Sequence, residues 1–146
     1  MRSRHSKTAH HIAICEANYL RLESLLINFL KDRHTFELHL NDQDIQHISF
    51  LILERTKHTL MIEAKQSDFS SPLNAFVIRI NVFIDAGLAE VASYQSEKPL
   101  PFFYKKPSIQ SKDEKDQQNR FLTEWLESIF ISGIAPKSAI EKIFDD

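Results

Sequence analysis

Glycine and cysteine are rare in this 146-residue chain, and their scarcity excludes several classes of protein. With two glycines, the chain cannot build the glycine-rich loops that bind phosphates in nucleotide-binding proteins. Cys15 is the only cysteine, so an internal disulfide cannot form and a four-cysteine zinc site is excluded. The catalytic patterns HExxH and GxSxG are also missing. The sequence carries no standard enzyme signature and no cofactor motif, and its cysteine usage is typical of the bacterial cytoplasm, where we expect it.

Long apolar runs and a strong net charge are missing as well. The longest uncharged apolar stretches, such as residues 128–135, are far shorter than the roughly 20 residues that cross a bilayer. Charged residues interrupt the N-terminal apolar positions before a signal-peptide core could form. A formal net charge of −2 gives no global field that would attract nucleic acid or anionic lipid. We therefore expect no membrane segment and no secretion signal.

Phenylalanine, in contrast, is abundant. Eleven phenylalanines and a hydrophobic fraction of 42% indicate a folded chain with a large aromatic core. The length is close to that of one domain. We therefore expect a single domain over residues 1–146, in which residues 1–8 form a frayed basic tail.

Helical spacing of apolar residues marks both ends of the chain. From about Thr8 to Lys31 these residues recur every three or four positions, which predicts an amphipathic helix. A second helix is expected to begin at Ser111, the start of a capping box, and its apolar stripe places Trp125 in the core. Gly133 is suited to end this helix, and a short final helix is expected beyond it, over residues 136–144.

Between the helices the apolar period changes to two, the pattern of half-buried strands. Five segments show it: residues 36–40, 46–54, 59–65, 75–85 and 88–94. Prolines on either side of residues 102–104 favour an edge strand or an extended cover there. We predict an α+β fold in which a five-stranded antiparallel meander carries the N-terminal helix and the C-terminal helix on one face.

Three motifs connect the chain to a family. They are CEANY at residues 15–19, DA at 85–86 followed by AEV at 89–91, and DEKDQQNRFLTEWL at 113–126. With them the chain resembles the YqiB-like family of small proteobacterial proteins, which has no assigned activity. The resemblance spans most of the chain but implies no function.

The start of the second helix is the main candidate site. There the apolar stripe becomes polar, which predicts a polar pocket or docking surface beside the core. Residues of the first helix join it in our hypothesis. The candidate ligand- or partner-binding residues are Glu16, Asn18, Asp113, Lys115, Gln117 and Asn119. The alternative is that these side chains cap the helix and anchor the preceding loop.

Other clusters are weaker. His11 and Cys15 are one helical turn apart, but two ligands are too few for a metal site, and the sequence identifies no third. The charged residues Glu63, Arg79, His39 and Glu90 could meet on the sheet face that the helices leave uncovered. The basic N-terminus and the aromatic and basic residues at 102–106 could contact RNA, but a frayed tail and a cover of the sheet edge account for them better.

Three classes of function follow, none with a signature. A protein-interaction or adaptor domain fits best, because a compact domain without a catalytic motif most often works through its surface. A small-ligand or RNA-binding module is the alternative. An enzyme is least favoured, because the sequence pairs no nucleophile with a base, and we assign no catalytic residue and no metal ligand.

Overall fold

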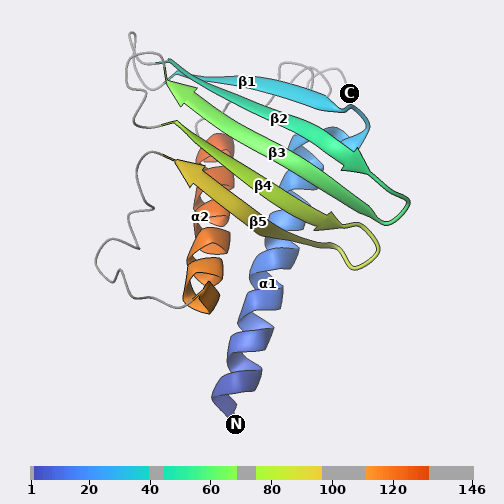
Figure 1. Ribbon diagram of the computed structural model, residues 1–146, viewed down its shortest axis with the longest axis vertical. Coiled ribbons are helices and arrows are strands. Elements are labelled where there is room, and N and C mark those ends of the chain that lie inside the picture. The colour runs from blue at the N-terminus through green and yellow to red at the C-terminus, as the bar shows by residue number, and fades with distance from the viewer. Residues whose placement is uncertain (1, 40–44, 69–74, 97–110, 132–146) are drawn as a thin grey trace.

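In a computed structural model, the chain forms one five-stranded sheet with two helices packed on the same face (Figure 1). The structure describes residues 2–39, 45–68, 75–96 and 111–131. Within these, the elements are α1 (Arg2–Leu25), a short 3₁₀ helix η1 (Ile27–Phe29), β1 (Arg33–His39), β2 (Ile45–Arg55), β3 (Thr59–Asp68), β4 (Phe76–Phe83), β5 (Leu88–Ser96) and α2 (Ser111–Ile131). The predicted α+β class and five-stranded antiparallel sheet are confirmed.

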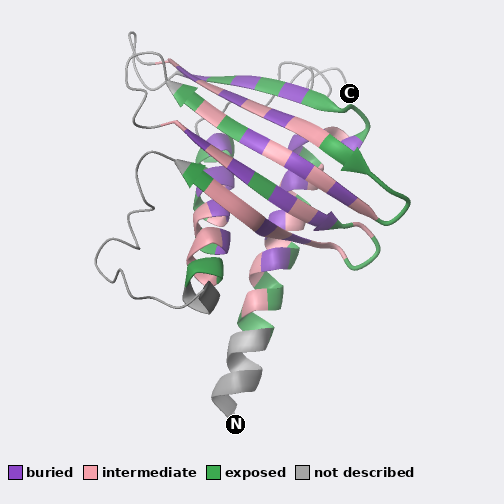
Figure 2. Cartoon of the chain, viewed as in Figure 1, coloured by how far each residue is buried: buried purple, intermediate pink, exposed green. Residues whose placement is uncertain are grey.

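The sheet is a meander in which each strand pairs with its neighbour in the sequence. The spatial order is β1-β2-β3-β4-β5, and all four pairings are antiparallel. Alternate residues point to opposite faces of each strand. Figure 2 shows this along β4, where buried and less buried positions alternate. The periodicity of two in the sequence therefore reflects a sheet with one covered face.

The core lies between the covered face of the sheet and the two helices. The two helices and the turn after α1 contribute to this core the buried residues Leu22, Leu25, Leu26, Leu122, Trp125, Leu126 and Ile129. Trp125 is buried, as predicted, and its ring centroid lies 5.5 Å from that of Phe50 and 5.1 Å from that of Phe76. Its indole Nε1 donates a hydrogen bond to Gln66 Oε1 at 2.8 Å, so the polar atom of this core residue has a partner.

The first helix differs from its predicted bounds at both ends. It begins at Arg2 rather than near Thr8, because the polar residues before Thr8 give no periodic signal that would mark a boundary. It ends at Leu25 rather than Lys31. The next residues turn left-handed, with φ of 51° at Ile27 and 58° at Asn28.

The buried side chain of Phe29 explains why the apolar spacing does not reveal that α1 ends at Leu25. Phe29 also has a positive φ, of 59°, yet its side chain returns to the core. Arg55 Nη2 donates to the Phe29 carbonyl oxygen at 2.9 Å and holds the turn. Leu30, which the helical stripe would bury, is 73% exposed. Apolar spacing thus continues past the point where the helix stops. The predictions for residues 102–104, Gly133 and residues 136–144 lie outside the described residues.

Candidate functional site

The polar start of α2 packs against β5, which is an edge strand of the sheet. Asn119 is buried, and its Oδ1 accepts a hydrogen bond from the Val91 backbone N–H at 2.7 Å. Its Nδ2 donates to the Lys115 carbonyl oxygen at 2.8 Å. Lys115 Nζ in turn donates to the carbonyl oxygens of Val91 at 3.0 Å and Ala92 at 2.6 Å. These two side chains supply partners to backbone groups of an edge strand.

A bulge in β5 sets this arrangement. The register pairs Ile80 with Val91 but Arg79 with Ser93, so Ala92 is the extra residue. A bulge leaves its extra residue unpaired and bends the strand. Unpaired backbone groups are costly when buried and invite other strands when exposed. Side chains of α2 therefore take the place of a sixth strand at this point.

Asn18 connects the two helices inside the same network. It is fully buried, and its Nδ2 lies 3.3 Å from the Asn119 carbonyl oxygen, to which it donates. Thr123 Oγ1 donates to Asn18 Oδ1 at 2.7 Å. A few residues further along, Arg21 Nη2 donates to Glu127 Oε1 at 2.7 Å. A buried amide with both ends satisfied fixes how α1 sits on α2.

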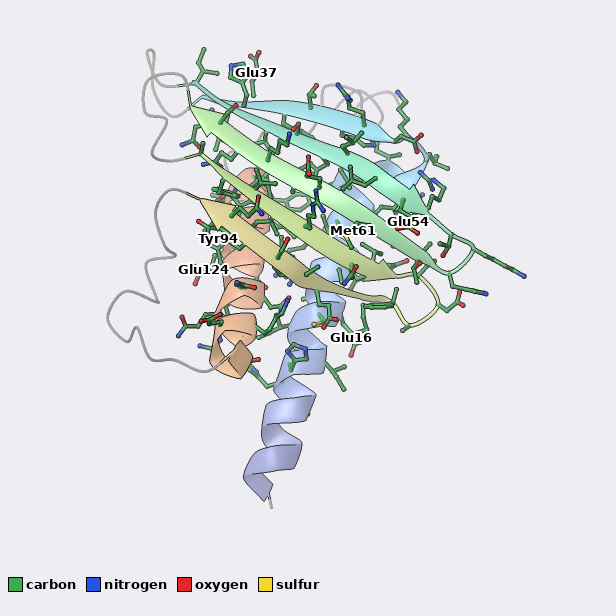
Figure 3. The ribbon with its side chains drawn as sticks, viewed as in Figure 1. Glu16, Glu37, Glu54, Met61, Tyr94 and Glu124 are labelled. Carbon is green, nitrogen blue, oxygen red and sulfur yellow. The ribbon has the colours of Figure 1, made fainter. Side chains whose placement is uncertain are left out.

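The six residues predicted as a site therefore separate into groups. Asn18, Lys115 and Asn119 come together, and each bonds within the protein. Gln117 is half-buried, and its buried Oε1 has no hydrogen-bond partner among the described residues. Glu16 is exposed on α1 and takes no part in the network (Figure 3). The side chain of Asp113 lies outside the described part of the chain.

A second cluster lies at the same junction of α1, β5 and α2. Cys15 Sγ lies 3.6 Å from His11 Nε2, and Glu90 Oε2 lies 3.7 Å from the same nitrogen. These three ligand atoms are all within 4.8 Å of one another. Asp116 Oδ1 lies 3.5 Å from the other ring nitrogen, Nδ1. The sequence placed His11 and Cys15 together, and the fold adds the two carboxylates.

Cys15 is the buried member of this cluster, with 2% of its surface exposed. Burial, followed by the charges of Glu90 and Asp116, raises the pKa of its thiol to about 11. The free thiol is therefore protonated at neutral pH. A neighbouring cation would be needed to stabilise the thiolate there.

In space, His11 lies between Cys15 and Asp116, as a base lies between a nucleophile and an orienting carboxylate in a catalytic triad. Two features argue against nucleophilic catalysis. A nucleophilic cysteine needs access to substrate and an electropositive surrounding that favours the thiolate. Here Sγ is buried, and Glu90 adds negative charge beside it. The same Glu90 is a useful ligand if a cation occupies the cluster.

The uncovered face of the sheet holds a separate charged group. Glu63 pairs in register with Arg79, and its Oε2 lies 3.4 Å from Arg79 Nη2, as the sequence hypothesis required. Lys65 Nζ lies 3.2 Å from Glu63 Oε1. Glu90 turns to His11 instead, and the side chain of His39 lies outside the described residues. A depression of about 130 Å³ beside this group is lined by Arg33, Ser49, Leu51, Glu63 and Lys65.

The fold and the junction define a small α+β protein with an open antiparallel sheet and two helices on one face. A family model of proteins of unknown function, DUF1249, matches residues 21–134, and the chain belongs to this family. The match includes Glu90 and Asp116 but begins after His11 and Cys15. No curated protein and no solved structure matches the chain. Neither described helix is long and apolar enough to cross a membrane.

Proposed function

We propose that this chain is a non-enzymatic protein-interaction domain that binds a helix of a partner protein on the outer side of α1. The observation that carries the proposal is an exposed row formed by Ile12, Glu16 and Leu20, called the outer row below. Ile12 is 41% exposed and Leu20 is 60% exposed. Glu16, a residue of the candidate site, lies between them and is also exposed.

Helix geometry makes these three residues a continuous strip. Positions four apart lie above one another on the same side of a helix. The buried residues of α1, such as Cys15 and Leu22, point to the core. The helix therefore presents apolar side chains on two sides, although a surface helix normally needs only one apolar stripe. Beside the outer row, Ala13 is exposed and small, which lets another helix approach closely.

The outer row indicates the chemistry of its partner. The fitting partner is an amphipathic helix that carries a Lys or Arg between two apolar residues. Its apolar side chains would contact Ile12 and Leu20, and its cation would lie at Glu16. A second copy of this chain fits less well. In a symmetric antiparallel pair centred on the row, Glu16 would face Glu16, and like charges repel.

The candidate residues of the internal network support this surface from behind. Asn18 and Asn119 hold α1 against α2 through buried hydrogen bonds. A rigid helix loses little freedom on binding, which favours affinity. Lys115 and Gln117 lie on α2, which packs on the Asn18 side of α1, so they lie outside the outer row.

We also propose that the chain belongs to the YqiB-like group of the family and that it is located in the cytoplasm. The motifs at residues 15–19 and 113–126 support membership of the YqiB-like proteobacterial group within the family. The single cysteine supports a cytoplasmic location. A partner in that compartment is expected to be another protein.

Charge reversal across the interface tests the proposal. A photo-reactive amino acid at Ser24, which is exposed four residues beyond Leu20 in the last turn of α1, would mark the partner in cells. Sequencing of the linked peptide would show whether the contact is a helix. With the purified partner, Leu20→Asp and Glu16→Lys should each weaken binding about tenfold or more, as interface anchors do. Changing the facing Lys or Arg of the partner to Glu should restore binding to Glu16→Lys.

Leu53→Asp is the matched control. Leu53 lies on β2, away from α1, and is 42% exposed. It should bind as tightly as the unchanged chain. Equal binding by Leu20→Asp, or loss of binding only in Leu53→Asp, would show that the outer row is not the interface. If RNA or a nucleotide copurifies and no protein does, the chain is a ligand- or RNA-binding module and not an adaptor.

A further inference from the structure

We infer that His11, Cys15 and Glu90 form a binding site for one divalent transition-metal ion of the zinc type, with Asp116 orienting the histidine. The site joins the middle of α1 to β5 and α2. It is independent of the proposed docking row, which uses other side chains of α1.

Distances between the ligand atoms fit a tetrahedral ion. Zinc binds a Cys sulfur at about 2.3 Å and a His nitrogen or carboxylate oxygen at about 2.0–2.2 Å, so tetrahedral angles separate sulfur from nitrogen by about 3.6 Å and nitrogen from oxygen by about 3.4 Å. The corresponding distances are 3.6 Å from Cys15 Sγ to His11 Nε2 and 3.7 Å from Nε2 to Glu90 Oε2. Cys15 Sγ and Glu90 Oε2 thus both lie at suitable distances from His11 Nε2, and all three atoms are within 4.8 Å of one another.

Asp116 supplies a second, independent feature. Histidine ligands commonly give the proton of their other ring nitrogen to a carboxylate, which fixes the tautomer and the ring orientation. Asp116 Oδ1 lies 3.5 Å from Nδ1, so it favours the proton there and leaves Nε2 free for a metal. The carboxylate is therefore on the correct side of the ring for this role.

Charge and ligand type narrow the ion. Glu90 and Asp116 bring two carboxylates to one buried thiol, and a cation relieves their mutual repulsion. A thiolate and an imidazole suit zinc and its neighbours in the transition series, whereas calcium and magnesium prefer oxygen ligands. A site with three protein ligands leaves one tetrahedral position for water or a solvent ligand.

Solvent can reach that position. The side chains of His11 and Glu90 are 35% and 41% exposed, whereas Cys15 closes the inner side. An ion can therefore enter without unfolding of the helix. The ligands come from α1 and β5, which are far apart in the sequence, so binding also ties these elements together.

Metal titration of the purified full chain tests the site. After treatment with a chelator, Zn²⁺ should bind in one equivalent, and Co²⁺ should give a cobalt–thiolate charge-transfer band. His11→Gln and Glu90→Gln should each raise the Kd about tenfold or more, and Asp116→Asn should raise it about 10- to 100-fold while keeping the band. Cys15→Ser should abolish the band.

His10→Gln is the matched control, because His10 is an exposed histidine next to His11 on α1. It should bind zinc as the unchanged chain does. Because Cys15 is buried, Cys15→Ser could destabilise the fold. The zinc affinities of His11→Gln and Glu90→Gln therefore decide whether the site exists, and circular dichroism verifies that both variants are folded. Unchanged zinc affinity in both variants, or a cobalt complex without the thiolate band in the unchanged chain, would overturn the site.

Discussion

Asn119 Oδ1 accepts a hydrogen bond from the backbone N–H of Val91 at 2.7 Å, so a side chain of α2 completes the edge of the sheet. An edge strand normally leaves such groups free for another chain. Ala92 is the extra residue of the bulge in β5, and Lys115 Nζ donates to the carbonyl oxygens of Val91 and Ala92. The side chains at the polar start of α2 therefore bond the edge of the sheet as a neighbouring strand would.

Replacing Asn119 with Leu should destabilise the protein. Leucine fills a similar volume but leaves the Val91 N–H without its partner, and an unsatisfied buried group costs about 1–3 kcal/mol. Urea unfolding would measure the loss. Arg120→Leu, at an exposed position next to it on α2, should change the free energy of unfolding by less than about 0.5 kcal/mol. Equal effects of the two changes would mean that the network at β5 contributes nothing.

Trp125→Ala should lower the free energy of unfolding by about 3–5 kcal/mol, because it removes a large buried side chain. The ring contacts to Phe50 and Phe76 and the bond to Gln66 are lost together. Thermal or urea unfolding measures this cost. Phe130→Ala is the control, since that aromatic is exposed on the same helix. A native tryptophan emission like that of free tryptophan would contradict the buried position.

Asn28 allows a test of the left-handed turn after α1. Its φ is 58° and its side chain is exposed, so the backbone conformation dominates the effect of substitution. Asn28→Gly should keep or raise stability, whereas Asn28→Ala should lower it by about 1 kcal/mol. Melting temperatures of the two variants give the comparison. The reverse order would show that the turn is not left-handed in solution.

His34 should make the protein sensitive to mild acid. It is buried, its Nε2 has no hydrogen-bond partner among the described residues, and burial together with Lys31 lowers its pKa below the usual 6.5. The unfolded chain therefore takes up a proton near pH 6.5 that the folded chain resists, so stability falls as the pH drops below that value. Denaturant midpoints between pH 7.5 and pH 5 would show it.

His34→Phe should reduce this acid dependence, because it removes the titrating group and its unpartnered nitrogen. His10→Gln, a change at an exposed histidine, should leave the dependence as it is. If the slope of stability against pH is the same in His34→Phe, another group is responsible for it.

The sequence predicted the sheet well because alternation is a local property. In β4, Phe76, Ile78 and Ile80 are buried and the residues between them are not, as their period of two required. The end of α1 was missed for a physical reason. Phe29 continues the apolar spacing of the helix and is buried, although α1 has ended and the φ of Phe29 is positive.

The candidate site was predictable only in part. Asn18 and Asn119 stood out because each is polar within an apolar stripe. Their partners depend on the bulge at Ala92 and on the packing of α1 against α2, which no local pattern encodes. For the same reason, His11 and Cys15 were visible as a pair, but Glu90 joins them only through the tertiary fold.

The meander order has a consequence for synthesis on the ribosome. Each strand pairs with the one made just before it, so the sheet can grow from successive hairpins with short loop closures. The helix α1 is made before the sheet, yet its bonds from Asn18 to Asn119 and from Arg21 to Glu127 connect it to α2, which is made after the sheet. Until α2 is complete, the leucines of α1 lack part of their cover. Among the described elements, α1 is therefore the one that needs chaperone protection for the longest time during synthesis.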